Sequence, residues 1–204
     1  MIVEGKQKIW ADYQKDIPDD HYFYVRSCIR QSFFPGSEVT FLDITRNKLG
    51  KDFYESAYHT TCGGIAYHSD SIPQETAMTI IARQFALMHE SGYENYVCSC
   101  ITSFGCYTET LETWHEFPEL EAKIRQYLWD SCKKEFAKPK YLAHASDIIY
   151  KFRHEIAKQA KYKLVNAKTG KPLKVVEHIG CHYAKMFPSK GFGGAEYPHV
   201  LVGM

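Results

Sequence analysis

The sequence lacks a long apolar run, and its charges are almost balanced. No stretch approaches the roughly 18 apolar residues that a membrane-spanning helix needs. The opening MIVEGKQKIW has no apolar core of a secretory signal. The net charge is +1, from 25 basic and 24 acidic residues, which gives no general attraction to nucleic acid or to a membrane surface. These absences favour a cytoplasmic protein with no membrane span and no nucleic-acid partner.

The charge is nevertheless uneven along the chain. Residues 133–174, which we call the basic segment, hold twelve Lys and Arg residues against three acidic ones. A solvated helix face explains such a composition. A docking face for an acidic partner is the alternative.

The cysteines also lack the regular close pairs of a zinc ribbon. Intervals of 33 and 35 residues separate the first three, whereas zinc-ribbon ligands come in pairs two to four residues apart. An odd number without an export signal favours a reducing compartment, where clustered thiols bind metals or do redox chemistry. The seven are Cys28, Cys62, Cys98, Cys100, Cys106, Cys132 and Cys181.

Helical patterns alternate with short runs rich in aromatic and β-branched residues. Strands are predicted at 21–28, 52–56, 93–98 and 174–181, and residues 138–142 form a connector with room for a short strand. Helices are predicted at 37–49, from a capping box at Ser71 and Gln74 to Gly92, from Pro118 to about residue 132, and from Ser146 or Asp147 to about residue 160. Residues 98–106 are expected to be a loop. This order predicts an α/β fold with a mostly parallel sheet covered by helices.

The predicted strands bring several thiols to one place. Cys28, Cys98 and Cys181 each fall at the carboxyl end of a predicted strand, and Cys62 follows another strand in the loop HTTCGG. Right-handed crossovers put these ends at one edge of the sheet, where open α/β sheets bind ligands. Gly63 and Gly64 would let the backbone approach something bulky there, such as a metal or a cluster.

A short pattern occurs twice. The form C-x5-F-P begins at Cys28 and again at Cys181, both after a β-rich run, and this suggests a duplicated unit. We therefore expect an amino-terminal extension over 1–20, a first cysteine-rich α/β unit over 21–137, and over 138–204 the beginning of a second, incomplete unit.

The order of these elements resembles the cysteine-rich CCG domain of the heterodisulfide reductase B-subunit family. The resemblance runs over about residues 21–200. It rests on Cys28, Thr61-Cys62-Gly63, Cys98, Cys106-Tyr107 and HIGCH at 178–182, with NKLG at 47–50 and ETA at 75–77 in matching places. Members act on disulfides or thiols, and relatives in sulfur-oxidising prokaryotes act on persulfides or on a lipoyl-bound carrier.

The resemblance implies an iron–sulfur cofactor, a 4Fe–4S cluster of cubane or noncubane type. It also implies an oxidoreductase role in electron transfer. Partners would be the iron–sulfur and flavin subunits of a heterodisulfide-reductase-like complex and a small thiol, disulfide or persulfide carrier. Cys28, Cys62, Cys98 and Cys106 are the expected ligands, with Cys100 competing for the last place. Cys62, Cys181 and His182 would lie at the reacting centre, with Thr61, Gly63 and Gly64 beside the cofactor.

Two departures from the family pattern stand out. Thr61 occupies the place of the first Cys in Cys-Cys-Gly, which weakens the expectation of a noncubane cluster. Cys181 resembles the first ligand of a second motif that residues up to Met204 do not complete.

Two other interpretations of the same thiols stay open. A structural zinc protein would use them without moving electrons, and a metal-free thiol–disulfide switch would use Cys98, Cys100 and Cys106. Cys132, in a predicted helix away from the other thiols, is expected to be a small buried apolar residue.

Overall fold

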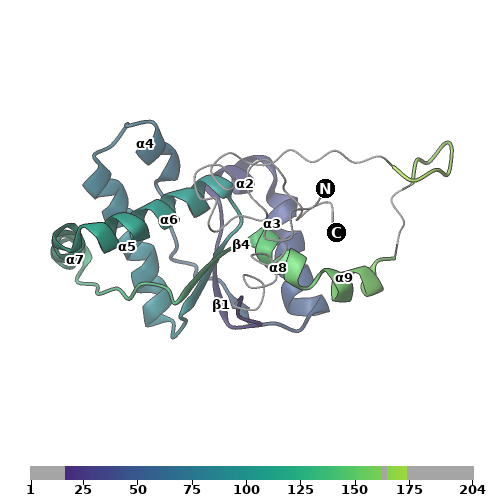
Figure 1. Cartoon of the computed structure of the whole chain (residues 1–204), viewed down its shortest axis with the longest axis horizontal. Coiled ribbons are helices and arrows are strands. Elements are labelled where there is room, and N and C mark those ends of the chain that lie inside the picture. The colour runs from purple at the N-terminus through teal and green to yellow at the C-terminus, as the bar shows by residue number, and fades with distance from the viewer. Residues whose placement is uncertain (1–16, 162–164, 174–204) are drawn as a thin grey trace, which may run out of the picture.

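A computed structural model describes residues 17–161 and 165–173 of the chain. Its centre is a parallel four-stranded sheet in the order β2-β1-β3-β4 (Figure 1). The strands are β1 (Tyr22–Val25), β2 (Phe53–Tyr54), β3 (Asn95–Cys98) and β4 (Tyr141–His144). The predicted α/β class with a parallel sheet is confirmed. The strand expected at 174–181 lies outside the described residues.

Helices cover both faces of this sheet (Figure 1). One face carries α4 (Gly64–His68), α5 (Gln74–Glu90), α6 (Ile101–Glu116) and α7 (Pro118–Cys132). The other carries α3 (Pro35–Leu42), the π-helix η1 (Asp43–Lys48), α8 (Ala145–Lys151) and α9 (Arg153–Gln159), with the short α2 (Cys28–Phe33) at the sheet edge. The result is a three-layer arrangement with an apolar core on each side of the sheet.

The two-residue period of the strands divides side chains between these cores. On β3, Tyr96 and Cys98 face the core under α5 and α6, whereas Val97 faces the core under α3 and α8. On β1, Phe23 joins the first core and Tyr24 the second. Both faces are buried, as parallel sheets require.

Two local predictions were wrong, a loop at 98–106 and a capping box at Ser71. Residues 98–106 are not all loop, because α6 begins at Ile101 and continues to Glu116. Its threonines and Gly105 have weak helix propensity, and burial of Phe104 and Trp114 outweighs it. The capping box at Ser71 is absent as well, since Pro73 precedes α5 at the N-cap position.

Other helix predictions are confirmed in outline. The helix expected at 37–49 is α3 followed by η1, and Gly50 ends it with a left-handed backbone (φ 65°). The helix expected from Pro118 is α7. The connector at 138–142 does hold a strand, β4, whose last residue, His144, caps α8 together with Asp147.

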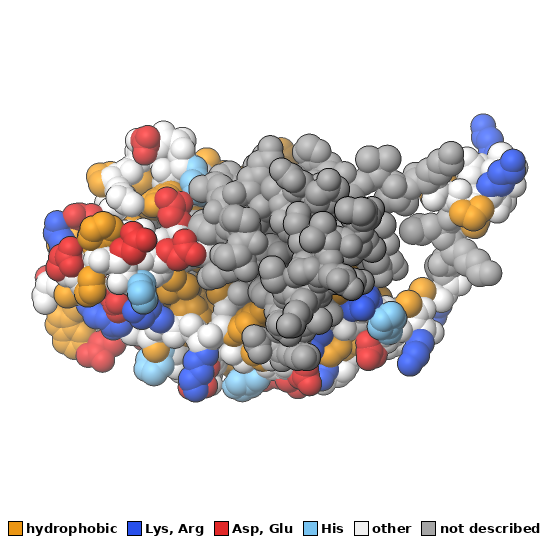
Figure 2. All heavy atoms as spheres, viewed as in Figure 1, with side chains coloured by type: hydrophobic (Ala, Val, Ile, Leu, Met, Phe, Trp, Pro, Cys, Tyr) orange, Lys and Arg blue, Asp and Glu red, His pale blue; other side chains and the backbone are white. Residues whose placement is uncertain are grey.

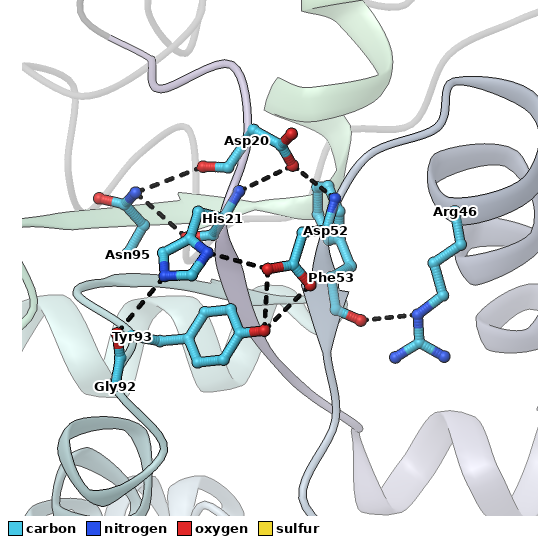
Figure 3. A network of polar contacts seen from close by, with 8 residues as sticks. All are labelled: Asp20, His21, Arg46, Asp52, Phe53, Gly92, Tyr93 and Asn95. Carbon is cyan, nitrogen blue, oxygen red and sulfur yellow. Dashed lines mark hydrogen bonds and ion pairs between the residues drawn. The ribbon is translucent and has the colours of Figure 1, made fainter.

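The amino ends of the strands are joined by a polar network (Figure 3). The Asp52 carboxylate, just before β2, accepts a hydrogen bond from Tyr93 at 2.9 Å and lies 2.8 Å from Nδ1 of His21. The His21 and Tyr93 rings stack with centroids 4.2 Å apart. Asn95 donates to the His21 carbonyl at 3.2 Å. The network therefore ties the starts of β1, β2 and β3 together, at the edge opposite the cysteines.

A second polar cluster fixes α7 to the connector before β4. Glu121 accepts hydrogen bonds from Arg125 at 2.7 Å and from Lys138 at 2.8 Å. Burial alone would raise the pKa of Glu121, but these two cations outweigh burial and hold the pKa below its ordinary value. Among the residues described, no helix combines the length and the apolar character that crossing a membrane requires.

Candidate functional site

The carboxyl edge of the sheet gathers the cysteine-bearing segments. Strand register aligns Val25 with Cys98, and Cys98 with His144. Two residues after Val25, Ser27 caps α2, so Cys28 is the first helical residue and not the end of a strand as predicted. Cys28 is exposed. The α2 start and the β3–α6 turn thus emerge side by side from neighbouring strands.

The loop HTTCGG is fixed from α5 by one buried amide. The side chain of Gln84 donates to the Thr60 carbonyl at 2.6 Å and to the Thr60 hydroxyl at 3.0 Å. The Thr61 hydroxyl oxygen accepts a hydrogen bond from the Gly63 N–H of the same loop at 3.3 Å. The loop that presents Cys62 is therefore held in place before any ligand arrives.

Both glycines of this loop occupy positions where a side chain would cause strain or a close contact. Gly63 has φ of 69°, a left-handed conformation that costs other residues about 1–2 kcal/mol. Gly64 begins α4, and a Cβ placed on it would lie 3.2 Å from the Cys62 sulfur and 3.5 Å from the Cys106 Cβ. The absence of a side chain at Gly64 allows Cys62 and Cys106 to approach each other.

Cys62 is buried and receives two hydrogen bonds. The Ser103 hydroxyl of α6 donates to its sulfur at 3.0 Å, and the Gly64 N–H donates at 3.2 Å. Burial raises the pKa of the Cys62 thiol despite these donors, and the nearby Cys28 and Cys100 thiols add to the shift. A buried sulfur with two fixed donors is suited to a thiolate bound to metal, which needs its charge compensated.

Cys98 and Cys106 lie in the same core as Cys62. Burial raises the pKa of both thiols, and the Cys62 thiol acts in the same direction on each. In a protein without a bound cation these two sulfurs are held as neutral thiols. A metal that displaces their protons would supply the missing positive charge.

Cys100 behaves differently. It occupies the N-cap position of α6 and makes no regular capping hydrogen bond. Burial opposes its ionisation, but the N–H groups of Ser103 and Thr102 and the hydroxyls of Ser27 and Ser103 outweigh burial, so the pKa of the Cys100 thiol is lowered. Thiols at helix N-termini commonly show this shift. Cys100 thus ionises more readily than Cys62, Cys98 and Cys106, whose thiol pKa values are raised.

The structure brings Cys62, Cys98, Cys100 and Cys106 to one region, which we call the thiol cluster, with Cys28 at its exposed margin. In residues 17–161 and 165–173, no three His, Cys, Asp or Glu side chains stand close enough to hold one metal ion. Cys132 lies apart on α7, where its thiol donates to the Leu128 carbonyl at 3.3 Å. Cys181 and His182 lie outside the described residues.

Several residues around the thiol cluster had no signal in the sequence. Glu38 of α3 accepts from the Ser27 N–H and from the Ser99 hydroxyl, each at 2.7 Å, and so ties the β1–α2 turn to the β3–α6 turn. His144 is buried at the end of β4, where burial lowers the pKa of its imidazole to about 3 and keeps it neutral. Glu38 leaves no pattern in the sequence, because it bonds residues that are far from it in the chain.

The donor set fits an iron–sulfur cluster in three respects. Four thiols share one region, the backbone at Gly64 approaches them without a side chain, and the Gly64 N–H already points at sulfur. Two buried tyrosine hydroxyls on the same side of the sheet, those of Tyr96 and Tyr107, make no regular hydrogen bond among the residues described. Buried polar groups without regular partners are rare and call for an explanation.

Comparison with known proteins finds similarity to a reductase subunit. No family model matches the chain. The curated B subunit of the ferredoxin:CoB-CoM heterodisulfide reductase of Methanosarcina acetivorans is 24% identical to it over 194 residues. The match covers 92% of this chain and 60% of that relative, so the chain spans under two thirds of the relative's length. The similarity to heterodisulfide reductase B subunits that the cysteine pattern indicated is therefore confirmed over most of the chain.

Proposed function

We propose that this chain is an iron–sulfur redox subunit of a heterodisulfide-reductase-like complex. The observation that supports it best is the convergence of Cys62, Cys98, Cys100 and Cys106 from three segments at one sheet edge. Open parallel sheets place ligands there. The similarity to a reductase B subunit over 92% of the chain gives independent support.

In this proposal Cys28, Cys62, Cys98 and Cys106 hold a 4Fe–4S cluster, and Cys100 is the alternative fourth ligand. When bound, the cluster would supply electrons one at a time to a disulfide or persulfide. Reduction of a disulfide to two thiols consumes two electrons and two protons. The chain's own residues hold the thiols: Gln84 fixes the Cys62 loop, and the Gly64 N–H and Ser103 hydroxyl donate to the Cys62 sulfur.

The exposed margin of the site is the place for a sulfur substrate. Cys28 is exposed and Cys100 is half-buried, whereas Cys62, Cys98 and Cys106 are buried. A small thiol, disulfide or persulfide carrier would therefore approach from the side of α2. Cys181 and His182 stay candidates for the same centre as the resemblance implies.

Partner subunits that deliver electrons would dock on a charged face. The basic segment is a candidate, although four of its lysines pair with acids elsewhere in the chain: Lys134 with Glu90, Lys138 with Glu121, Lys140 with Glu94 and Lys151 with Asp19. Figure 2 shows Lys and Arg side chains over α9 and residues 165–173, while acidic side chains gather at the end formed by α5–α7. Docking through this surface should weaken as salt concentration rises, because exposed charges are screened.

The decisive experiment is anaerobic purification followed by iron and sulfide analysis and EPR spectroscopy. We expect stoichiometric iron and sulfide and a brown chromophore. Cys62→Ser should abolish the chromophore, whereas Cys132→Ser, which removes a thiol from α7, should leave it intact. Zinc without iron, or equal spectra for the two variants, would contradict the proposal.

One observation favours a second candidate function, a thiol–disulfide switch. Cys100 has a lowered thiol pKa, and the Cys98 thiol lies 3.8 Å from the Cys100 carbonyl. A reactive thiol beside a second one can form a disulfide by exchange with a disulfide-containing partner, which takes up the two electrons and two protons and leaves as two thiols. Metal-free protein with a disulfide among Cys98, Cys100 and Cys106, found by mass spectrometry, would support this alternative.

A further inference from the structure

Two buried tyrosines lie against the thiol cluster. Tyr96 stands two residues before Cys98 on β3, so both side chains project from the same face of the strand. Tyr107 follows Cys106 on α6 and lies one helical turn after Ser103, whose hydroxyl donates to the Cys62 sulfur at 3.0 Å. Both tyrosines are fully buried, in the same core as Cys62, Cys98 and Cys106.

The two phenol rings pack edge to face. Their ring centroids are 5.1 Å apart with an interplanar angle of 86°, and each hydroxyl acts on the other. Neither makes a hydrogen bond of regular geometry with any other group in the described part of the chain. Each phenol has one proton to donate. One hydroxyl of the pair can donate its proton to the oxygen of the other. The proton of the second hydroxyl is then left without an acceptor within the pair.

The sulfurs of Cys62 and Cys98, in the same core as both phenols, are groups that could accept this proton once a metal is bound. The thiols of Cys62 and Cys98 both act electrostatically on Tyr96 and on Tyr107. As thiols they are weak acceptors, whereas a thiolate or sulfide carries negative charge and accepts a charge-assisted bond. Leaving a buried hydroxyl without a hydrogen-bond partner destabilises the fold. Binding of a cluster would remove that penalty.

We infer that the Tyr96–Tyr107 hydroxyl pair donates a hydrogen bond to sulfur of the bound cluster and thereby raises its reduction potential. The inference rests on the proposed function and goes further by naming two residues that tune it. Reduction adds negative charge to the sulfurs, so a donor stabilises the reduced state more than the oxidised one. Tyr96 and Tyr107 are in this sense positioning and tuning residues, not ligands.

The test is an anaerobic redox titration of the full chain followed by EPR. Tyr96→Phe and Tyr107→Phe each keep the ring and remove only the hydroxyl. We expect each to lower the equilibrium constant for one-electron reduction about threefold to tenfold, which is roughly 30–60 mV. ENDOR spectra of the wild type, compared in H2O and D2O, should show an exchangeable proton coupled to the cluster. The spectra of the two variants should lack it.

Tyr22→Phe is the matched control. Tyr22 is also fully buried in the sheet, but it faces the opposite core, and its hydroxyl donates to the Pro18 carbonyl at 2.8 Å. This variant loses one hydrogen bond without touching the thiol cluster, so its potential should equal that of the wild type. A general loosening of the fold would shift all three variants together.

Four outcomes decide the matter. Lowered potentials in the Tyr96 and Tyr107 variants with an unchanged control support the inference. Iron-loaded variants with wild-type potentials and a retained exchangeable proton overturn it and leave the proposed function intact. Failure of both variants to bind iron while Tyr22→Phe binds it would assign the hydroxyls to assembly and also overturn it. Wild-type protein without iron would overturn both the proposed function and the inference.

Discussion

Replacing Gly64 by alanine should destabilise the protein through Cys62. The added Cβ would lie 3.2 Å from the Cys62 sulfur, closer than an ordinary contact. That sulfur cannot easily retreat, because it is buried and held by the Ser103 hydroxyl and the Gly64 N–H. Overpacking of this kind costs about 1–3 kcal/mol, and alanine in a helical turn recovers about 0.5–1 kcal/mol. We expect a net loss of up to about 2.5 kcal/mol.

Gly36→Ala supplies the matched comparison. Gly36 lies in α3, and nothing stands within 4 Å of the Cβ that alanine would add. This variant should gain about 0.5–1 kcal/mol, since alanine is the better helix former. Urea unfolding of the reduced, chelator-treated chain measures both free energies. If Gly64→Ala stabilises the chain as much as Gly36→Ala does, the steric account of the thiol cluster is refuted.

Two further predictions concern residues away from the thiols. Glu121→Gln removes the carboxylate that pairs with Arg125 and Lys138 and should cost up to about 1 kcal/mol at pH 7. Because the folded-state pKa of Glu121 is lowered, its carboxylate stabilises the fold above about pH 4.5, and this contribution disappears as the pH falls through the lower folded value. The deficit of the variant in urea midpoint should therefore be largest at pH 7 and should shrink as the pH falls below about 4.5. A deficit that is the same at pH 7 and at pH 3 would contradict the reasoning. His21→Ala should cost about 1 kcal/mol by opening the network at the amino edge and should leave iron content unchanged; lower iron content would show that the two edges are coupled.

The sequence predicted the class of fold because its strands and helices have clear local patterns. The parallel sheet, α5 and α7 follow from apolar periodicity and from Gly and Pro positions. The helix α6 did not follow, because its threonines and Gly105 disfavour a helix and only burial of Phe104, Tyr107 and Trp114 stabilises it. Tertiary packing decided that element, and no local pattern reports packing.

Cys62 and Cys98 could be placed at one edge from the sequence, since each follows or ends a predicted strand. Their surroundings could not. Glu38 joins two turns that are 72 residues apart in the chain, at Ser27 and Ser99, and Gln84 reaches back from α5 to Thr60. Hydrogen bonds between distant segments leave no periodicity, so residues of this kind become visible only in three dimensions.

The polar network formed by His21, Asp52 and Tyr93 stabilises the edge of the sheet that carries none of the described cysteines (Figure 3). It anchors the strand starts at the edge opposite the cysteines, and so makes that edge a suitable point of attachment. A linker attached there would hold the molecule on an electrode with its cysteine-rich rim turned toward the solution, open to small thiols.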